Sequence, residues 1–228
     1  MITDFTVAGI NCHIYIDGNP KAAFYWGTAS GHTDIEQTLA LIKKSGGRDY
    51  LLCAYEAQDW NRDYSPWPAP PVFGKESFGG QGKETLAFLN EQLRPHVEEQ
   101  YPKAAQSIIA GYSLAGLFSL WAALNSSFDG AISCSGSLWY PNWLTYLQQT
   151  TISAQAKYFY LSLGDKESKT KNKIMATVGE NTQQTAAYLS AKANCHFEWN
   201  QGGHFQNSEE RMAKGIMYML EHIPSGAK

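Results

Sequence analysis

One stretch of the sequence constrains the fold of this chain most. It is a short apolar run that ends near a glycine and is followed by a serine and then by a helix-like segment. The stretch reads SIIAGYSLAGLFSLWAAL and covers residues 107–124. Its first part, Ser107–Ala110, is short and apolar, as in a buried strand. The apolar residues after it recur at spacings of three and four, which is typical of a packed helix: Leu114, Leu117, Phe118, Trp121 and Leu124. The stretch predicts a strand, a sharp turn and a helix, with Ser113 in the turn.

Small residues surround this serine. Gly111, Ala115 and Gly116 suit a sharp turn, because larger side chains there would collide with the neighbouring backbone. The pattern departs from a strict Gly-x-Ser-x-Gly, since the fifth residue is alanine and the glycine comes one place later. A serine in such a turn is either a nucleophile or a helix cap, and the rest of the chain has to distinguish the two.

The composition is that of a globular chain with one core. Of 228 residues, 43% are hydrophobic and 17% are charged, which suits a single domain over residues 1–228. The net charge of −3 provides no basic surface for nucleic acid, and no apolar segment approaches the length of a membrane span. No secretory signal is visible at the N-terminus. We expect a cytoplasmic protein without nucleic-acid or membrane partners, and the composition assigns no oligomeric state.

The cysteines are far apart and show no metal-ligand spacing: Cys12, Cys53, Cys134 and Cys195. Buried, reduced thiols are the usual state of such cysteines in an intracellular protein. We therefore expect no disulfide framework, no metal site and no cofactor.

Strand-like and helix-like segments alternate along the chain. Strands are predicted at Cys12–Ile16, Ala22–Trp26, Tyr50–Tyr55, Ser107–Ala110, Gly130–Ser135, Lys157–Leu163 and Cys195–Trp199. Helices are predicted at Ile35–Lys44, Leu86–Tyr101 with a kink at Pro95, Leu114–Leu124, Asn142–Gln149, Met175–Lys192 and Ser208–His222. The turn signal Asp17-Gly18-Asn19-Pro20 favours an antiparallel hairpin of the first two strands. The repeats after it predict an α/β fold, a mostly parallel sheet with helices on both faces.

Ser113 would lie at the carboxyl end of a central strand, where such sheets bind ligands. A serine becomes a nucleophile when a histidine takes its proton and an acid holds that histidine. His204 follows two glycines between the last strand and the closing helix, and either Asp165 or Glu167 could be the acid. Spacing does not choose between the two carboxylates. The order serine, acid, histidine favours a catalytic triad over a capping serine.

An acyl-transfer site also needs backbone N–H groups that stabilise an oxyanion. Leu114 would supply one, because it follows the serine at the helix N-terminus. The loop after the second predicted strand, Gly27-Thr28-Ala29, is expected to supply the other through Thr28.

Four stretches resemble the putative-esterase (esterase D-like) family of the α/β-hydrolase superfamily: Asn61–Pro66 (NRDYSP), Gly111–Gly116, Ser133–Trp139 (SCSGSLW) and Gly202–Phe205. The resemblance extends from about Ala22 to His222, and SCSGSLW is most similar to siderophore (enterobactin-type) esterases. It implies an α/β-hydrolase fold. We expect no cap domain, because this chain has too few residues to insert one into that fold. It also implies Glu167 as the acid, because the family's acid often stands fourth in a Gly-x-x-Asp/Glu turn. Arg62 would contact substrate.

The chain is thus predicted to be a serine carboxylesterase that acts on a small-molecule ester through an acyl-enzyme. Its open site would be lined by Trp60, Trp67, Tyr112 and Trp139, which suits a bulky or aromatic acyl group. The same triad could serve a thioesterase or peptidase. A non-catalytic binding protein on this fold is the other alternative; it would be marked by a missing triad residue, and none is missing.

Overall fold

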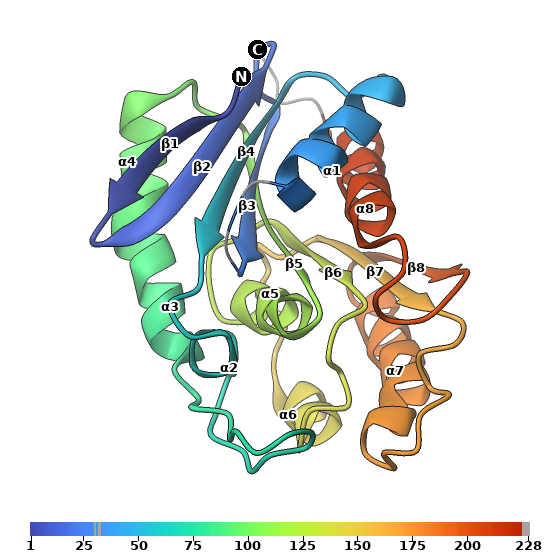
Figure 1. Cartoon of the computed structure of the whole chain (residues 1–228). Helices are drawn as coiled ribbons and strands as arrows, with labels where there is room; N and C mark the ends of the chain where they lie inside the picture. The colour runs from blue at the N-terminus through green and yellow to red at the C-terminus, as the bar shows by residue number, and fades with distance from the viewer. Residues whose placement is uncertain (30, 32, 225–228) are drawn as a thin grey trace.

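Eight strands form one sheet within the described residues of this computed structural model, which are 1–29, 31 and 33–224 (Figure 1). Their order across the sheet is β1-β2-β4-β3-β5-β6-β7-β8. β2 runs antiparallel to both its neighbours, β1 and β4, and the pairs from β4 across to β8 are all parallel. The strands are β1 Thr3–Val7, β2 Ile10–Asp17, β3 Ala22–Thr28, β4 Tyr50–Glu56, β5 Gln106–Tyr112, β6 Gly130–Cys134, β7 Tyr158–Gly164 and β8 Asn194–Asn200.

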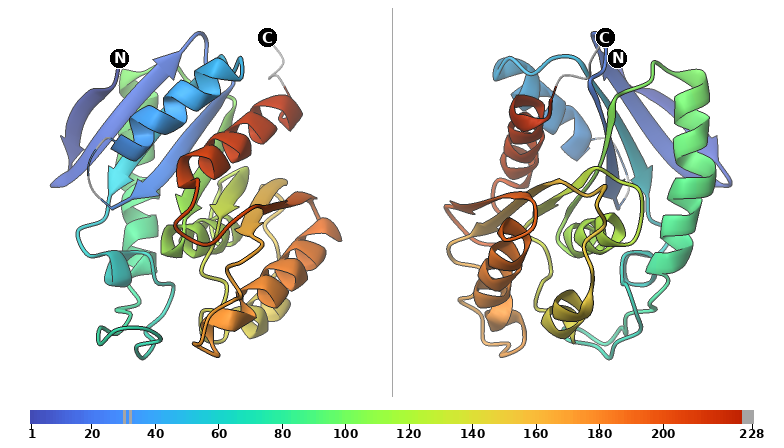
Figure 2. Two further views of the ribbon diagram at one scale, coloured as in Figure 1. Left: turned by 45° about the vertical axis from the view of Figure 1, so that its right-hand side comes forward. Right: turned by 180° about the vertical axis from the view of Figure 1, so that it is seen from behind.

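Helices cover both faces of this sheet, as Figure 2 shows from two further sides. Apolar residues of α1 and α8 pack against one face, and those of α3, α4, α5 and α7 pack against the other. The helical segments are α1 Thr33–Lys44, α2 Trp60–Asp63, α3 Gly82–Phe88, η1 Leu89–Leu93, α4 Arg94–Gln100, α5 Leu114–Leu124, α6 Trp143–Gln149, η2 Met175–Thr177, α7 Val178–Ser190 and α8 Ser208–His222. The predicted mixed α/β fold with helices on both faces is therefore confirmed.

The N-terminal hairpin is made by other strands than the sequence indicated. β1 pairs with β2 through a turn at Ala8 and Gly9, which both have positive φ. β4 lies between β2 and β3, so the expected hairpin across Asp17-Gly18-Asn19-Pro20 does not form. The apolar run of β3 is buried almost throughout, which suits a central parallel strand better than half of a hairpin.

Pro95 marks a change of helix type. The predicted helix at Leu86–Tyr101 is a continuous run of α3, η1 and α4, in which η1 is a π-helical turn. Proline lacks the N–H that would continue the α-helical ladder, and its ring clashes with the preceding turn. The wider turn just before Pro95 accommodates both effects within one helix.

The parallel strands bring four connections to one edge of the sheet. Thr28 is the last residue of β3, and the loops after β5, β7 and β8 carry Ser113, Glu167 and His204. The helix after β5 is buried along its whole length, so the turn before it is firmly held. Among the described residues, none of the helices has the length and apolar character that a membrane span requires.

Candidate active site

Ser113 lies in a strained turn between β5 and α5. Its backbone has φ 58° and ψ −122°, a conformation that costs free energy for a residue other than glycine. A Cβ atom on Gly111 would lie 2.2 Å from the carbonyl oxygen of Ala115, which explains why the turn needs glycine there. Although Ser113 stands at the N-cap position of α5, its side chain makes no capping hydrogen bond. The hydroxyl instead points to a histidine.

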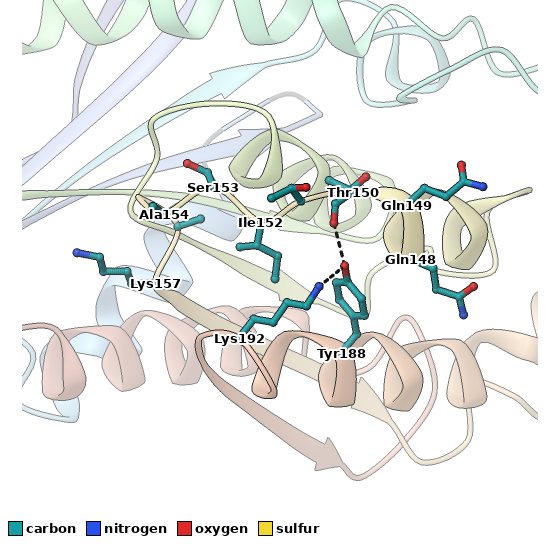
Figure 3. A pocket seen from close by; sticks show the side chains of 11 residues that line it. Gln148, Gln149, Thr150, Ile152, Ser153, Ala154, Lys157, Tyr188 and Lys192 are labelled. Carbon is teal, nitrogen blue, oxygen red and sulfur yellow. Dashed lines mark hydrogen bonds between the residues drawn. The ribbon is translucent and has the colours of Figure 1, made fainter.

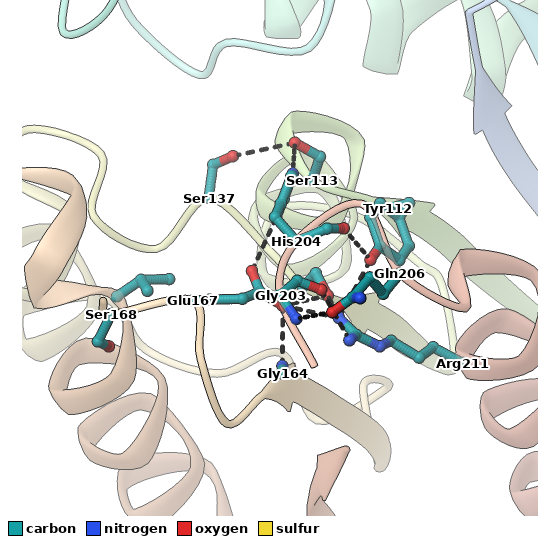
Figure 4. Close-up of polar contacts among 12 residues, drawn as sticks. Tyr112, Ser113, Ser137, Gly164, Glu167, Ser168, Gly203, His204, Gln206 and Arg211 are labelled. Carbon is teal, nitrogen blue, oxygen red and sulfur yellow. Dashed lines mark hydrogen bonds and ion pairs between the residues drawn. The ribbon is translucent and has the colours of Figure 1, made fainter. Parts of the chain in front are cut away.

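Three side chains form one hydrogen-bonded row (Figure 4). Ser113 Oγ lies 2.9 Å from His204 Nε2, and His204 Nδ1 lies 2.7 Å from Glu167 Oε2. Asp165, the alternative acid, instead accepts the backbone N–H of Gly202 at 2.8 Å. Of the two carboxylates left open by the spacing, Glu167 is the one that contacts the imidazole.

Glu167 is nearly inaccessible, with 3% of its side chain exposed. Its second oxygen, Oε1, accepts hydrogen bonds from the Ser135 hydroxyl at 2.8 Å and from the Gly164 N–H at 2.8 Å. Burial by itself raises the pKa of this carboxyl group. The hydrogen bonds from His204, Gly164 and Ser135 outweigh that effect, and the pKa of Glu167 lies below its ordinary value. The group is therefore ionised at neutral pH.

Tyr112 holds the backbone of the loop that carries His204, whereas Glu167 holds its imidazole. Its hydroxyl donates to the backbone carbonyl of His204 at 2.6 Å. Burial raises the pKa of Tyr112 to about 12, so the phenol stays neutral and remains a donor. The sequence analysis expected Tyr112 to contact substrate; the structure places it in the wall of the cleft and also in contact with the histidine loop.

A mostly apolar cleft of about 630 Å³ opens over Ser113 and His204. Four further predicted site residues lie in or beside it: Trp60, Trp139 and Thr28 line it, and the N–H of Leu114 begins α5 next to Ser113. The remaining lining includes aromatic and aliphatic side chains that were not predicted as site residues: Trp26, Phe73, Met175, Val178, Phe205 and Met212.

Trp67 and Arg62, which were also predicted to contact substrate, do not line this cleft. Trp67 packs against Tyr140, with ring centroids 5.7 Å apart, and its indole N–H donates to the carbonyl of Pro141 at 3.0 Å. Arg62 Nε lies 2.8 Å from Asp63 Oδ1, and the arginine faces a separate hollow together with Tyr55. Both residues are used to hold the long segment that follows β4.

Arg62→Ala should leave the KM of small esters unchanged, because the side chain lies outside the cleft. The Arg62–Asp63 pair is over a third exposed on the arginine side, so its loss should cost at most about 1 kcal/mol of stability. Steady-state kinetics with two esters of different acyl length checks this. A KM raised severalfold for both would mean that Arg62 reaches the substrate after all.

A second hollow, of about 350 Å³, lies between the α6–β7 connection and α7 (Figure 3). Its walls are polar, and the Tyr188 hydroxyl donates to the carbonyl of Thr150 there at 2.8 Å. The residues that line it include two lysines but no histidine, cysteine or carboxylate. Because none of these lining residues forms a hydrogen-bonded row of nucleophile, base and acid, the cleft over Ser113 is the candidate active site.

The sequence analysis missed two contributors. Ser137 lies in the cleft, and its N–H donates to the carbonyl of Ser113 at 2.9 Å. Arg211 is fully buried on α8 and lies 2.7 Å from Glu167 Oε1. A signal for the arginine was available, since Gly215 and Met219 follow it at intervals of four on the buried side of α8.

A sequence model of the family described as "Putative esterase" matches residues 15–209. The chain belongs to this family. The resemblance seen in the sequence is thereby confirmed, and membership makes the protein a serine hydrolase of the esterase type. The family acts on esters, so a small-molecule ester is the expected kind of substrate.

The individual relatives and solved structures share little sequence identity with this chain. The chain is 27% identical over 183 residues to YbbA, an uncharacterised protein of Bacillus subtilis, covering 77% of this chain and 72% of that protein. An IroE-like serine hydrolase from Shewanella oneidensis has a TM-score of 0.81 at 14% identity, with 97% of this chain and 80% of that one covered. The siderophore hydrolase EstA from Aspergillus nidulans has a TM-score of 0.77 at 18% identity, covering 98% and 95%. These structures share the fold.

Proposed function

We propose that this protein is a carboxylesterase that hydrolyses small-molecule esters through an acyl-enzyme on Ser113. The observation that carries the proposal is the hydrogen-bonded row of Ser113, His204 and Glu167 at the floor of an apolar cleft. A hydroxyl, an imidazole and a buried carboxylate in this order are what nucleophilic acyl transfer requires.

Each group has a defined part in the mechanism. Ser113 Oγ attacks the ester carbonyl while His204 Nε2 takes its proton, and Glu167 holds the Nδ1–H tautomer and stabilises the imidazolium. The Leu114 N–H at the start of α5 and the Thr28 N–H stabilise the oxyanion. His204 then gives the proton to the departing alcohol. Water attacks the acyl-enzyme by the same route in reverse and frees the acid.

The lining of the cleft favours an uncharged, apolar acyl group. Aromatic and aliphatic side chains make up most of it, and its described residues include no lysine or arginine. Two carboxylates, Asp34 and Glu209, line the same cleft as Ser113 and His204. An anionic substrate would meet these carboxylates without a compensating cation.

p-Nitrophenyl butyrate should therefore be a better substrate than p-nitrophenyl hemisuccinate, which has the same leaving group and a carboxylate on a similar acyl chain. Repulsion between the substrate carboxylate and one carboxylate of the cleft should lower kcat/KM roughly tenfold for the anionic ester. Asp34→Asn should narrow the difference, and so should added salt. A hemisuccinate that reacts as fast as the butyrate in wild-type protein would contradict this selection by charge.

Labelling with a fluorophosphonate probe tests the function itself. Mass spectrometry should locate the adduct on Ser113, and a screen of p-nitrophenyl esters, feruloyl esters and a siderophore trilactone should show turnover. An acyl thioester and a peptide anilide test the thioesterase and peptidase alternatives, which use the same triad. Absence of both labelling and turnover would favour a non-catalytic binding protein on this fold.

A further inference from the structure

A fully buried arginine reaches the acid end of the hydrogen-bonded row (Figure 4). Arg211 is in the first turn of α8, and its Nη1 lies 2.7 Å from Glu167 Oε1 and 2.7 Å from Ser135 Oγ. A buried guanidinium is costly to desolvate unless it is paired and hydrogen-bonded. This one is paired with the carboxylate that holds His204, and the mechanism above does not use it.

The two oxygens of Glu167 have separate partners. Oε1 accepts from Arg211, from the Ser135 hydroxyl and from the Gly164 N–H, and Oε2 is left for His204. A Cβ atom on Gly164 would lie 2.8 Å from Arg211 Nη2, so the glycine leaves room for the guanidinium. The carboxylate cannot turn away from the imidazole without breaking three hydrogen bonds on Oε1.

The same guanidinium also holds the loop that carries the base. Arg211 Nη2 donates to the carbonyls of Gly203 at 2.9 Å and Gln201 at 3.3 Å. Arg211 Nη1 donates at 3.2 Å to the Tyr112 hydroxyl, which in turn donates to the carbonyl of His204. One rigid fork of donors thus links the acid, the histidine loop and the residue before the nucleophile.

We propose that Arg211 is a positioning residue for the hydrolysis, which fixes Glu167 and the His204 loop relative to each other so that the imidazole stays aligned on Ser113. The inference rests on the proposed function, since it assigns a role within that reaction. Arg211 touches neither the substrate nor the reacting atoms. Its effect passes through Glu167 and His204.

Three titratable groups are in contact with Arg211. They are Glu167, Tyr112 of β5 and Cys134 of β6, the last through an Sγ contact to the Arg211 carbonyl at 3.3 Å. Burial raises the pKa of Tyr112 and that of Cys134 to about 12, so both stay neutral. Of these groups only Glu167 would respond to loss of the cation: protonation of its carboxylate becomes easier, which moves the acid limb of a rate profile to higher pH.

Arg211→Met, Arg211→Lys and the control Lys214→Met, assayed on p-nitrophenyl butyrate from pH 5 to 9, test the proposal. Lys214 lies three residues further on α8, half exposed, and pairs with Glu198. Arg211→Met should lower kcat about 10²-fold with KM unchanged, the scale of a misplaced catalytic group, and should shift the acid limb upward. Arg211→Lys keeps the charge but loses the fork of donors, so it should restore the acid limb and recover only part of the rate. Lys214→Met should stay within about twofold of wild type.

A second variant keeps the test decisive if Arg211→Met alone does not fold. The pair Glu167→Gln with Arg211→Met buries no unpaired charge, and circular dichroism and melting will show whether it folds. Groups that act as a unit are non-additive, so adding Arg211→Met to Glu167→Gln should cost less than about threefold in kcat. In Glu167→Gln the imidazole can no longer take the serine proton, so holding it in place has no further value. A full 10²-fold further loss would therefore show that Arg211 acts by a route other than aligning the imidazole, which overturns the proposal.

The failure of this inference differs from a failure of the proposed function. If wild-type protein neither hydrolyses esters nor reacts with the fluorophosphonate at Ser113, the proposed function fails. If wild type is active and Arg211→Met matches Lys214→Met in kcat and pH profile, the arginine has only a structural role and the inference is overturned. A loss of rate that arises from a raised KM also overturns it, because positioning of the imidazole acts on kcat.

Discussion

Ser113→Ala should lower kcat by about 10⁶-fold while the protein keeps its fold. The hydroxyl is the only group in the row that can form the acyl-enzyme, and removal of a triad nucleophile leaves only binding and oxyanion stabilisation. The fold should tolerate the change, because Ser113 Oγ makes no capping bond and its contacts are His204 and, at 3.5 Å, Ser137. With His204 about a quarter exposed, water can replace the lost partner, and stability should stay within about 1 kcal/mol of wild type.

Release of p-nitrophenol by equal amounts of wild type and variant measures the loss, and thermal melting checks the fold. Ser153→Ala is a matched control, since Ser153 lines the polar hollow of Figure 3 and should have no effect on turnover. Fluorophosphonate labelling should disappear only in Ser113→Ala. If Ser113→Ala retains more than a few per cent of the rate, another residue must be the nucleophile. Ser137, whose Oγ lies 3.5 Å from Ser113 Oγ, would be the first candidate.

The strand, turn and helix around Ser113 could be predicted because their information is local. Small residues at a sharp turn, an apolar run before it and helical periodicity after it all agree on one structure. The order serine, acid, histidine was equally readable, since loops at the carboxyl ends of parallel strands converge. Local pattern and residue order are therefore enough to place Ser113 and His204 at one edge of the sheet.

The local sequence contains less information about which strands pair and which way a side chain points. A turn signal at Asp17–Pro20 shows that the chain bends, and it does not show that β4 will enter the sheet between β2 and β3. Trp67 was expected in the cleft because of its residue type, and Arg62 because the NRDYSP stretch resembles a substrate-contacting loop of the family. Which way they point depends on the contacts with Pro141 and Asp63, which no periodicity reveals. Arg211 was missed for the converse reason, since a charged residue in a helix is usually exposed.

The choice between Glu167 and Asp165 leads to the second large expected effect. Spacing left both open and the family resemblance favoured Glu167, which is the carboxylate that contacts His204 Nδ1 at 2.7 Å. In Glu167→Gln, the amide oxygen can keep the hydrogen bonds from Arg211, Ser135 and the Gly164 N–H. The amide NH₂ group then faces His204 Nδ1 and can only donate to it. The imidazole must carry its proton on Nε2, where it cannot accept the proton of Ser113.

Glu167→Gln should therefore lower kcat by about 10⁴-fold, the scale observed when a triad acid no longer holds the correct histidine tautomer. Loss of the charge also leaves Arg211 buried without its counter-ion, at a cost of about 3–5 kcal/mol, so melting must be measured with the kinetics. Asp165→Asn is the matched control. Its oxygen can still accept the Gly202 N–H, and kcat should stay within a few-fold of wild type. If the two variants rank the other way, Asp165 is the acid in solution and the contact between Glu167 and His204 is structural.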